Sequence, residues 1–592
     1  MQTKIYYLCD PMEKVWILKE DGDNELIEKL SEELNINKSL ANLLVQREIT
    51  NFDDARKFFR PSLKDLHDPF LMLNMDKAVK RINQAIENQE GILVYGDYDV
   101  DGTTSVALVY SFLKQIYPKI NFYIPDRYEE GYGISFKGID HAYKNNETLV
   151  IALDCGIKAV DKIEYANEKN IDFIICDHHL PGDTLPQASA VLDPKQKGCP
   201  YPYKELSGCG VGFKLMQAVA QERNIAFEKL EPCLDLVAIS IAADIVEIKG
   251  ENRILAYHGL KMLNENPRPG IESILKYSNI VRHFDKTKNK NVFEKDLTIS
   301  DLVFTIAPRI NAAGRIASGK KSVELLNCKQ QKGAEEIASG IDKYNKERRV
   351  LDKDITEHAL SIIANDSFLQ KSKSTVVYYN DWHKGVLGIV ASRLTEVYYR
   401  PTIVLSLIDG IYTGSARSVK GFDIYSAIDS CKDLLDNFGG HPFAAGLSIK
   451  KDNIEAFVER FEKYVSDHIE EKMLQPEIMI DAELETSQIS EKFYNVLNQF
   501  APFGPGNMSP VFITKNAWDT GYAKVVGENH LKLRLRNPLG NPNGFDAIAF
   551  GQKDALKFVK NKNFDICYTI NENVWKGRVS LQLMVKDIKE NN

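Results

Sequence analysis

Carboxylates recur directly after short apolar segments of this chain. The stretch YGDYDVDGTTS places Asp97, Asp99 and Asp101 at alternate positions. Carboxylates this close repel one another unless a cation compensates their charge, and hard oxygen ligands suit Mg²⁺ or Mn²⁺. The alternatives are a turn followed by a Thr or Ser helix cap, and an EF-hand, for which no Glu closes the loop. The spacing favours a metal site.

Two further motifs add ligands of the same kinds. LDCG contributes Asp154 after one apolar run, and CDHHLPG contributes Asp177, His178 and His179 after another. Adjacent histidines that follow an aspartate and precede Pro-Gly are poor material for a protein core. An imidazole nitrogen suits Mn²⁺ or Fe²⁺ better than Mg²⁺. An aspartate at a turn and a pair of surface histidines are the alternative interpretations.

A fourth motif lies on an apolar helix that is predicted to end in Asp244. It carries Asp235 near its start and Asp244 near its end. A carboxylate buried at Asp244 would need a partner, whereas Asp235 could face solvent. Together the four motifs supply about five carboxylates and two histidines. These are the donors of a two-metal site that clamps the attacking and leaving oxygens of a phosphoryl displacement.

These motifs need a scaffold that brings them together. The runs GILVYGD, NFYIPD, TLVIALD, IDFIICD and SAVLD each end in Asp, and helical segments separate several of them. Continuous apolar strands with helical crossovers predict a parallel sheet covered on both faces. Ligands of such sheets bind outside the carboxyl ends of the strands, so the acids are expected to meet at one edge.

Other parts of the chain predict further units. Residues 1–85 show helical spacing and are expected to form a leading cap or arm. Residues 325–368 predict a long charged connecting helix, and a second α/β unit with the Gly-rich segment FGGHPFAAG follows it. The final stretch, 469–592, holds five or so short strands, which suggests a small β-barrel such as an OB-fold.

Composition limits the classes of protein that fit. The chain has 592 residues with 44% hydrophobic and 27% charged residues, which excludes a mostly disordered or fibrous protein and suggests several domains. No apolar run is long enough to span a membrane, and the first residues do not resemble a signal peptide. The nine cysteines include no C-x-x-C pair, so reduced thiols and a cytoplasmic location are expected. The net charge of −8 argues against coating of nucleic acid by bulk charge but allows a local basic channel.

Arginine forks, hydroxyls and backbone amides are the groups that recognise phosphate. The segments IPDRYEEGYG, RINAAGR, GSARS and FGGHPFAAG hold such groups beside Gly or Ala, and surface ion pairs are the alternative for each arginine. The candidates for phosphate or nucleic-acid binding are Arg127, Arg309, Asn311, Arg315, Ser415, Arg417 and His441.

Side chains suited to bases and to the nucleic-acid backbone lie elsewhere. Tyr128 and Tyr132 could stack on a base or belong to the core. HLKLRLRN places Lys532, Arg534 and Arg536 on one face of a strand, which fits either a groove that tracks a nucleic-acid backbone or a solvated face.

The ordered motifs resemble a known family. GDYDVDGTTS, LDCG, CDHHLPG and AADIVE resemble the successive motifs of the DHH phosphoesterase superfamily, and RINAAGR, HKGVLGIVASRL, GSARS and GGHPFAAG resemble its RecJ branch over roughly residues 60–592. The resemblance implies a DHH domain over 86–265 and a motif-bearing segment with the connecting helix over 266–370. It further implies a DHHA1 domain over 371–468 and an OB-fold over 469–592.

The resemblance also implies a ligand set. It places metal ligands at Asp99, Asp101, Asp154, His178 and Asp244, with Asp154 as the bridging ligand. Asp97, Asp177 and His179 belong to the same motifs, and His179 is expected to orient the scissile phosphate or to protonate the leaving group. Many DHH phosphatases carry a His where this chain has Tyr95, so one coordination position is left for Asp97 or water.

The activity implied by the resemblance is that of a single-stranded-DNA-specific 5′-to-3′ exonuclease. Two divalent ions, Mn²⁺ with Mg²⁺ as substitute, would support hydrolysis to 5′-mononucleotides in DNA repair and recombination. The expected partners are single-stranded DNA and a helicase or single-strand-binding protein, with the chain as a monomer. Three alternatives stay open: a DHH enzyme for short RNA, cyclic dinucleotides or pyrophosphate, a non-catalytic RecJ-like scaffold, and an RNase.

Overall fold

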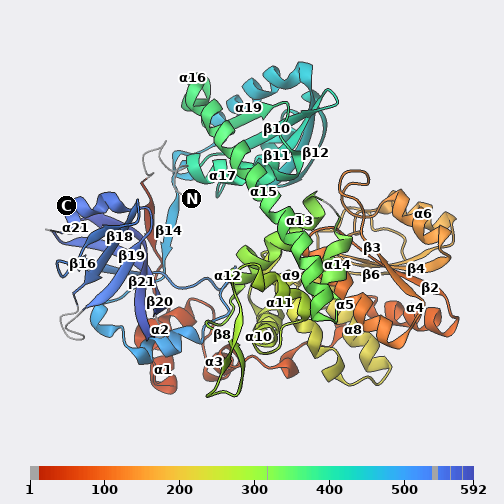
Figure 1. Cartoon of the computed structure of the whole chain (residues 1–592), viewed down its shortest axis with the longest axis horizontal. Coiled ribbons are helices and arrows are strands. Elements are labelled where there is room, and N and C mark those ends of the chain that lie inside the picture. The colour runs from red at the N-terminus through yellow and green to blue at the C-terminus, as the bar shows by residue number, and fades with distance from the viewer. Residues whose placement is uncertain (1–12, 317, 537–543, 561, 576–577, 592) are drawn as a thin grey trace. The chain divides into compact units, whose positions relative to one another are not determined.

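The chain forms two compact units in the computed structural model, which describes residues 13–316, 318–536, 544–560, 562–575 and 578–591 (Figure 1). The first unit combines Met1–Phe52, Glu347–Asn498 and Pro510–Asn592, and the second combines Asp53–Lys346 and Gln499–Ser509. Of the helices in the described ranges, none has both the length and the apolar character that crossing a bilayer requires.

A five-stranded parallel sheet is the base of the second unit. Its strand order is β3-β2-β4-β5-β6. The strands are β2 (Gly91–Gly96), β3 (Ile120–Tyr123), β4 (Glu147–Leu153), β5 (Asp172–Cys176) and β6 (Ala190–Leu192). The predicted parallel sheet is confirmed. Because the chain leaves β2 for β3 on one side and then returns to β4 on the other, the strand order reverses between β2 and β4. Ligands of open α/β sheets bind at such a reversal, outside the carboxyl ends of the strands.

Helices bury both faces of this sheet. Along β4, Leu149 and Ile151 pack into one core while Val150 and Ala152 pack into another, because alternate residues point to opposite faces. The first core includes α4 (Met75–Glu87), α5 (Val100–Ile116), α8 (Gly208–Glu222) and α9 (Leu234–Ala243), and the second includes α6 (Phe136–Lys144) and α7 (Val160–Glu168). Burial on both sides explains why the strands are continuous apolar runs.

The rest of the second unit is mainly helical. Its elements are α3 (Phe52–Phe59), α10 (Gly250–Glu265), α11 (Pro269–Lys276), the hairpin β7 (Arg282–Asp285) and β8 (Lys290–Phe293), α12 (Ile299–Asp301), α13 (Ala307–Ile316) and α14 (Lys320–Leu326). The predicted long helix is α15 (Gln331–Asn365), and the division between the two units falls within it.

The first unit contains the predicted second α/β fold. Its five-stranded sheet has the order β12-β13-β11-β10-β9, in which only β9 and β10 pair in parallel. The strands are β9 (Thr375–Tyr379), β10 (Thr402–Ile408), β11 (Ile411–Arg417), β12 (Leu435–His441) and β13 (Ala444–Lys450). One face packs against α18 (Ile424–Asp429) and α19 (Ile454–His468), and the other against α17 (Leu387–Tyr398) and α15.

The C-terminal part of the first unit is a seven-stranded sheet with the order β15-β16-β20-β21-β19-β18-β17. Its strands are β15 (Ala482–Glu483), β16 (Phe512–Ala517), β17 (Lys524–Val526), β18 (His530–Leu535), β19 (Phe545–Ala549), β20 (Phe564–Trp575) and β21 (Arg578–Glu590). The expected β-rich domain is present, but two of its strands are long: β20 and β21 span 12 and 13 residues and pair as one hairpin.

The expected N-terminal helical region, 1–85, is divided between the units, and its first 12 residues lie outside the described ones. It begins with a strand: β1 (Val15–Leu18) pairs in parallel with β14 (Glu477–Ile480), followed by α1 (Asn24–Leu34) and α2 (Lys38–Val45). At its other end, α4 buries Met75 and Ile82 in the core beneath the parallel sheet. These contacts make the region part of both units rather than a leading arm.

Candidate metal centre

The loop between β2 and α5 carries the first group of aspartates. Asp97 follows β2 directly, and Asp99 is the N-cap of α5, where its Oδ1 accepts the Gly102 N–H at 3.0 Å. Asp101 lies in the first turn of α5. A Cβ at Gly102 would lie 2.4 Å from the Asp97 carbonyl oxygen, so glycine permits the sharp turn from strand to helix. The helix is therefore capped by a member of the acid cluster, Asp99, and the expectation of a Thr or Ser cap is wrong, because Thr103, Thr104 and Ser105 lie inside α5.

Asp101 is buried and anchored by α8. Its Oδ2 accepts the Gly208 N–H at 2.7 Å, and its Oδ1 accepts the Cys209 N–H and the Ser240 hydroxyl, each at 2.7 Å. Backbone amides at a helix N-terminus are suited to a carboxylate. This support fixes the orientation of Asp101 in the cluster.

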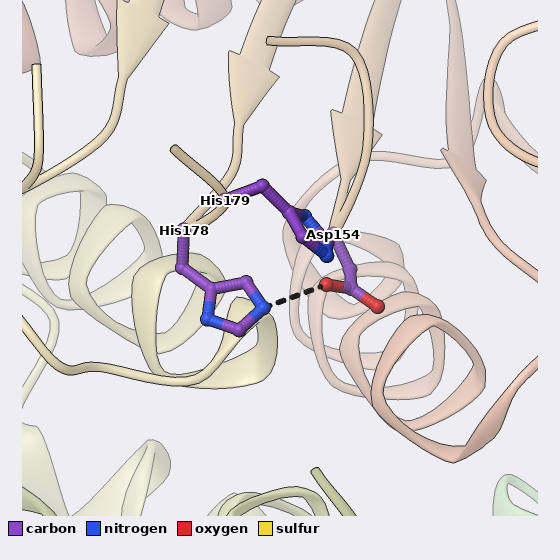
Figure 2. A group of neighbouring side chains, drawn as sticks. All are labelled: Asp154, His178 and His179. Atoms are coloured by element: carbon purple, nitrogen blue, oxygen red, sulfur yellow. Dashed lines mark ion pairs between the residues drawn. The ribbon is translucent and has the colours of Figure 1, made fainter. Parts of the chain in front are cut away.

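Asp154 follows β4 and His178 follows β5, so the two residues come from neighbouring strand ends (Figure 2). Asp154 has a left-handed φ of 58°, and its N–H donates to the Cys176 carbonyl at 2.8 Å. This backbone directs its Oδ1 toward His178 Nε2 at 3.3 Å. Gly208 leaves room for the carboxylate, since a Cβ there would lie 2.6 Å from Asp154 Oδ1.

His178 is the meeting point of the cluster. Its Nε2 lies 3.3 Å from Asp154 Oδ1, 3.5 Å from Asp244 Oδ2 and 3.9 Å from Asp101 Oδ2. Potential ligand atoms of Asp101, His178 and Asp244 lie within 4.8 Å of one another, as do those of Asp154, His178 and His179. Four motifs that are far apart in sequence therefore converge at the reversal point of the sheet.

Asp177 orients the histidine loop. Its Oδ1 accepts the His178 N–H at 2.8 Å and pairs with His179 Nδ1 at 2.7 Å, and its Oδ2 accepts the Ile157 N–H at 2.9 Å. Although burial opposes both shifts, this contact lowers the pKa of Asp177 to about 2 and raises the pKa of His179 to about 9. In the metal-free protein this favours a protonated His179 at neutral pH.

The crowded carboxyl groups of the cluster favour the binding of cations. Burial, followed by repulsion from neighbouring aspartates, raises the pKa of Asp97, Asp99 and Asp154 above the usual range, and it raises the pKa of Asp244 to about 8. Burial also lowers the pKa of His178, which keeps the imidazole neutral and able to act as a ligand.

Several buried atoms of the cluster lack hydrogen-bond partners. Within the described residues, no partner is recorded for Asp97 Oδ2, Asp154 Oδ1 or either ring nitrogen of His178. Buried polar atoms are nearly always satisfied, so these orphans indicate a missing ligand. Carboxylate oxygens with an imidazole nitrogen are a donor set that fits Mn²⁺ and accommodates Mg²⁺.

Comparisons with known proteins agree with this geometry. Family models match for the DHH family N-terminal domain at residues 91–241, the DHHA1 domain at 371–467 and the RecJ OB domain at 480–587. The single-stranded-DNA-specific exonuclease RecJ of Bacillus subtilis is 35% identical over 95% of this chain and 70% of its own length. The Escherichia coli protein of the same name is 33% identical over 87% of this chain and 90% of its own. The chain belongs to the RecJ family.

Solved RecJ structures share the fold. The Thermus thermophilus RecJ in complex with Mn²⁺ matches with a TM-score of 0.82 at 23% identity, covering 98% of this chain and 80% of that one. A structure of exonuclease RecJ bound to manganese matches with a TM-score of 0.57 at 28% identity, covering 69% and 97% of the two chains. The expected order of DHH, DHHA1 and OB domains is confirmed.

Tyr95 stands where many DHH phosphatases have a histidine, and in this RecJ family member it has a structural contact. Its buried hydroxyl donates to the Gly133 carbonyl at 2.9 Å and accepts the Ser135 N–H at 3.2 Å. Its ring packs in the core on the α6 and α7 side of the sheet. Tyr95 therefore does not act as a metal ligand, and the prediction that Asp97 or water takes this coordination position stays a prediction; Asp97 Oδ2 has no hydrogen-bond partner within the described residues.

Arg127 and Arg315 lie next to the first aspartate loop. The Arg127 guanidinium stacks 5.0 Å from the centre of the Tyr98 ring, in the middle of that loop. Helix α13 brings Arg315 there, because Gly314 allows its backbone to approach Tyr98: a Cβ would lie 2.5 Å from the Tyr98 carbonyl oxygen. Two of the predicted phosphate ligands thus flank the metal cluster within one unit.

The other candidates on α13 have different surroundings. Arg309 pairs with Asp342 at 3.2 Å and donates to the Thr305 carbonyl at 2.9 Å, so an internal carboxylate already compensates its charge. Asn311 is half-buried on the same helix. These surroundings do not identify either residue as a phosphate ligand. The role of Arg309 and Asn311 stays a prediction.

Ser415 and Arg417 on β11 and His441 on β12 lie on the two strands that flank β13 in the sheet of the first unit. Arg417 and His441 both lie opposite Ala444 in the register of β11, β13 and β12, and Arg417 Nη1 donates to Ser415 Oγ at 2.8 Å. Burial lowers the pKa of Arg417, and no carboxylate ion pair is recorded for it within the described ranges. A partly buried cation surrounded by small residues is suited to an anion.

Some functional residues were not predicted. Ser240 and Gly208 support Asp101 and Asp154, but only contacts across the fold reveal them. The run SGCGVGF, which begins α8, was the available signal in the sequence.

Asp235 does not face solvent, which was the alternative suggested by its place near the start of the helix. It is buried and pairs with Arg268, 2.5 Å from Nη2 and 2.6 Å from Nε, which makes it a structural residue.

Proposed function

We propose that this chain is a metal-dependent nuclease that degrades single-stranded DNA from its 5′ end and releases 5′-mononucleotides. The observation that carries the proposal is the convergence of Asp101, Asp154, His178 and Asp244 at the reversal point of a parallel sheet. The substrate follows from the RecJ family, whose Bacillus subtilis and Escherichia coli members are named single-stranded-DNA-specific exonucleases.

The metal-binding residues are proposed to act as a set. Asp101, Asp154, His178 and Asp244 would hold a pair of divalent cations, with Asp97 and Asp99 completing the ligands. When bound, such a pair activates water and stabilises charge on the attacking and leaving oxygens of a phosphodiester. Mn²⁺ is preferred because an imidazole is among the donors, and Mg²⁺ is the substitute. Solved RecJ structures contain Mn²⁺ or Mg²⁺.

His179 is proposed to handle the substrate phosphate. Its Nδ1 is engaged by Asp177, so its Nε2–H is left to donate, and 44% of the side chain is exposed. In the metal-free protein, the contact with Asp177 outweighs burial and raises the pKa of His179 to about 9, which favours a charged donor. It would orient a scissile phosphate oxygen or supply a proton to the leaving 3′ oxygen.

Two groups of anion ligands are proposed to set the polarity of digestion. Arg127 and Arg315 flank the metal cluster, and Ser415, Arg417 and His441 form a second group on the DHHA1 sheet. An anchored 5′ phosphate would place the first phosphodiester at the metals. Arg309 and Asn311 belong to the same proposal through their motif, although Arg309 pairs with Asp342.

The test is digestion of end-labelled oligonucleotides, single- and double-stranded, with and without Mn²⁺. We expect single strands with a 5′ label to release labelled mononucleotide at once, whereas a 3′ label persists until the end. Release of the 3′ label first, preference for RNA or for dinucleotides, or lack of cleavage with Mn²⁺ would each contradict the proposal. The last result would favour the non-catalytic scaffold.

We further propose the setting of this activity. The family resemblance supports a cytoplasmic monomer that acts in DNA repair and recombination on strands opened by a helicase or covered by a single-strand-binding protein. Size-exclusion chromatography with light scattering tests the monomer, and a dimer mass would contradict it. Stimulation of digestion by a helicase or by a single-strand-binding protein tests the proposed partners.

A further inference from the structure

The hairpin of β7 and β8 in the second unit has a tip with a concentrated positive charge. Its sequence from Asp285 to Lys290 is DKTKNK, and Lys286, Lys288 and Lys290 are all exposed. No ion pair is recorded for these three lysines among the residues that the structure describes. In a chain of net charge −8, this is a local exception that favours a polyanionic partner.

The tip is ordered by its own residues. Asp285 Oδ1 accepts the Thr287 N–H at 2.8 Å, the Thr287 hydroxyl at 2.6 Å and the Lys288 N–H at 3.3 Å. Asn289 takes the left-handed φ of 49° that closes the turn. Asp285 therefore shapes the turn, and it also lies opposite Lys290 and close enough to Lys288 for their charges to attract, while all three lysines are exposed.

The base of the hairpin is fixed to the unit. Phe293 is 5% exposed and belongs to the large core, and Arg282 pairs with Glu272 at 2.8 Å. The two strands pair Phe284 with Asn291 and Arg282 with Phe293, so these four side chains share one face. Figure 1 shows the hairpin extending from the helices of its unit.

An aromatic ring accompanies the lysines. Phe284 is 57% exposed although it shares a face with the buried Phe293, because it lies farther out toward the tip. Phe284 shares the hairpin with three exposed lysines, of which Lys290 lies opposite Asp285 on the other face. An exposed phenyl ring and exposed ammonium groups on one hairpin can bind unstacked bases and their phosphates without regard to sequence. A duplex keeps its bases stacked and would use only the lysines.

We infer that the β7–β8 hairpin is a second binding site for single-stranded DNA, in which Lys286, Lys288 and Lys290 contact phosphates and Phe284 stacks on a base. The inference rests on the proposed function for its substrate. It assigns the hairpin to strand retention and not to cleavage, because none of its residues belongs to the metal cluster or to the anion groups described above.

The experiment compares the full-length wild type with the K286A/K288A/K290A variant, using a single strand of roughly 50 nucleotides and another of roughly 8. Binding is followed by fluorescence anisotropy over a range of salt concentrations, with EDTA present to prevent cleavage. We expect roughly tenfold weaker binding of the long strand and a log–log salt slope less negative by about 2, near the value for three lost phosphate contacts. With Mn²⁺, cleavage of the short strand should be unchanged.

The matched control removes three exposed lysines from helices of the same unit: K77A/K80A/K261A. It makes the same change in net charge and should leave the salt slope at the wild-type value. An equal loss in the control would show a bulk-charge effect and overturn the inference. So would wild-type affinity and slope in the hairpin variant.

Phe284→Ala tests the stacking contact separately. It should weaken binding of the long single strand by roughly fivefold or more and leave duplex binding unchanged. Equal losses on both substrates, or no loss, would contradict stacking. Failure of the proposed function is distinguishable, because the wild type itself would then leave the short strand uncut with Mn²⁺.

Discussion

In the metal-free protein, several carboxyl groups of the metal cluster keep their protons to a higher pH than usual. Asp244 is the most accessible of its acids, with 31% of the side chain exposed, yet burial and the charges of Asp101 and Asp99 raise its pKa to about 8. The motifs AADIVE and CDHHLPG predicted that Asp244 and His178 would share a site. Sequence could not predict the raised pKa, because it depends on how closely acids from different motifs approach.

Metal removal should therefore make stability depend on pH. Because native Asp244 keeps a proton that the unfolded chain releases above a pKa of 3.8, the free energy of unfolding falls as pH rises toward about 8. We expect the melting temperature in EDTA to fall between about pH 5 and pH 8 and to recover on addition of Mn²⁺. Asp244→Asn should show a flatter profile, and parallel profiles for the two proteins would contradict this account.

At the scale of elements, the acids at the strand ends could be predicted from the sequence, but the residues that hold those acids in place could not. Each apolar run that ends in Asp became a parallel strand with an acid at its tip, since this pattern is local. The N-terminus of α8 supports two of these acids, but Gly208 and Asp101 are separated by 107 positions in the chain. Asp235 was misjudged for the same reason: its partner, Arg268, lies 33 residues away.

Gly208→Ala should disable the site without removing any ligand. The new Cβ would lie 2.6 Å from Asp154 Oδ1 and would displace that carboxylate. We expect the rate of DNA digestion with Mn²⁺ to fall by about 100-fold, as small displacements of catalytic groups do. Gly210→Ala on the same helix is the control, because its nearest contacts are 3.4 Å away. Normal activity in Gly208→Ala would show that the fit between α8 and Asp154 is unimportant.

At the scale of the whole molecule, the order of the domains could be predicted but the path of the chain could not. β1 pairs with β14, more than 400 residues later, and Gln499–Ser509 belongs to the second unit although its neighbours belong to the first. There, Arg253 Nη1 donates to the Phe500 carbonyl at 2.9 Å. Such non-local pairing has no signature in a local pattern of residues.

The OB domain should contribute affinity and not chemistry. Tyr522 lies beneath Lys524 and Arg534, whose charged groups are 4.8 and 4.6 Å from its ring centre. Tyr522→Ala should weaken binding of long single strands by roughly fivefold or more while leaving cleavage of very short ones unchanged. Tyr143→Ala, which removes a ring with a similar lysine contact on α6, should change neither. A loss confined to cleavage rate would contradict the assignment.

The central claim is that separate motifs form one metal-binding nuclease site, and Asp154→Asn tests it most directly. The substitution keeps the shape of the side chain and removes the charge that lies 3.3 Å from His178. Digestion of 5′-labelled single-stranded DNA with saturating Mn²⁺ should fall to the background rate, while circular dichroism stays that of the wild type. Digestion at the wild-type rate by the folded variant would contradict the claim.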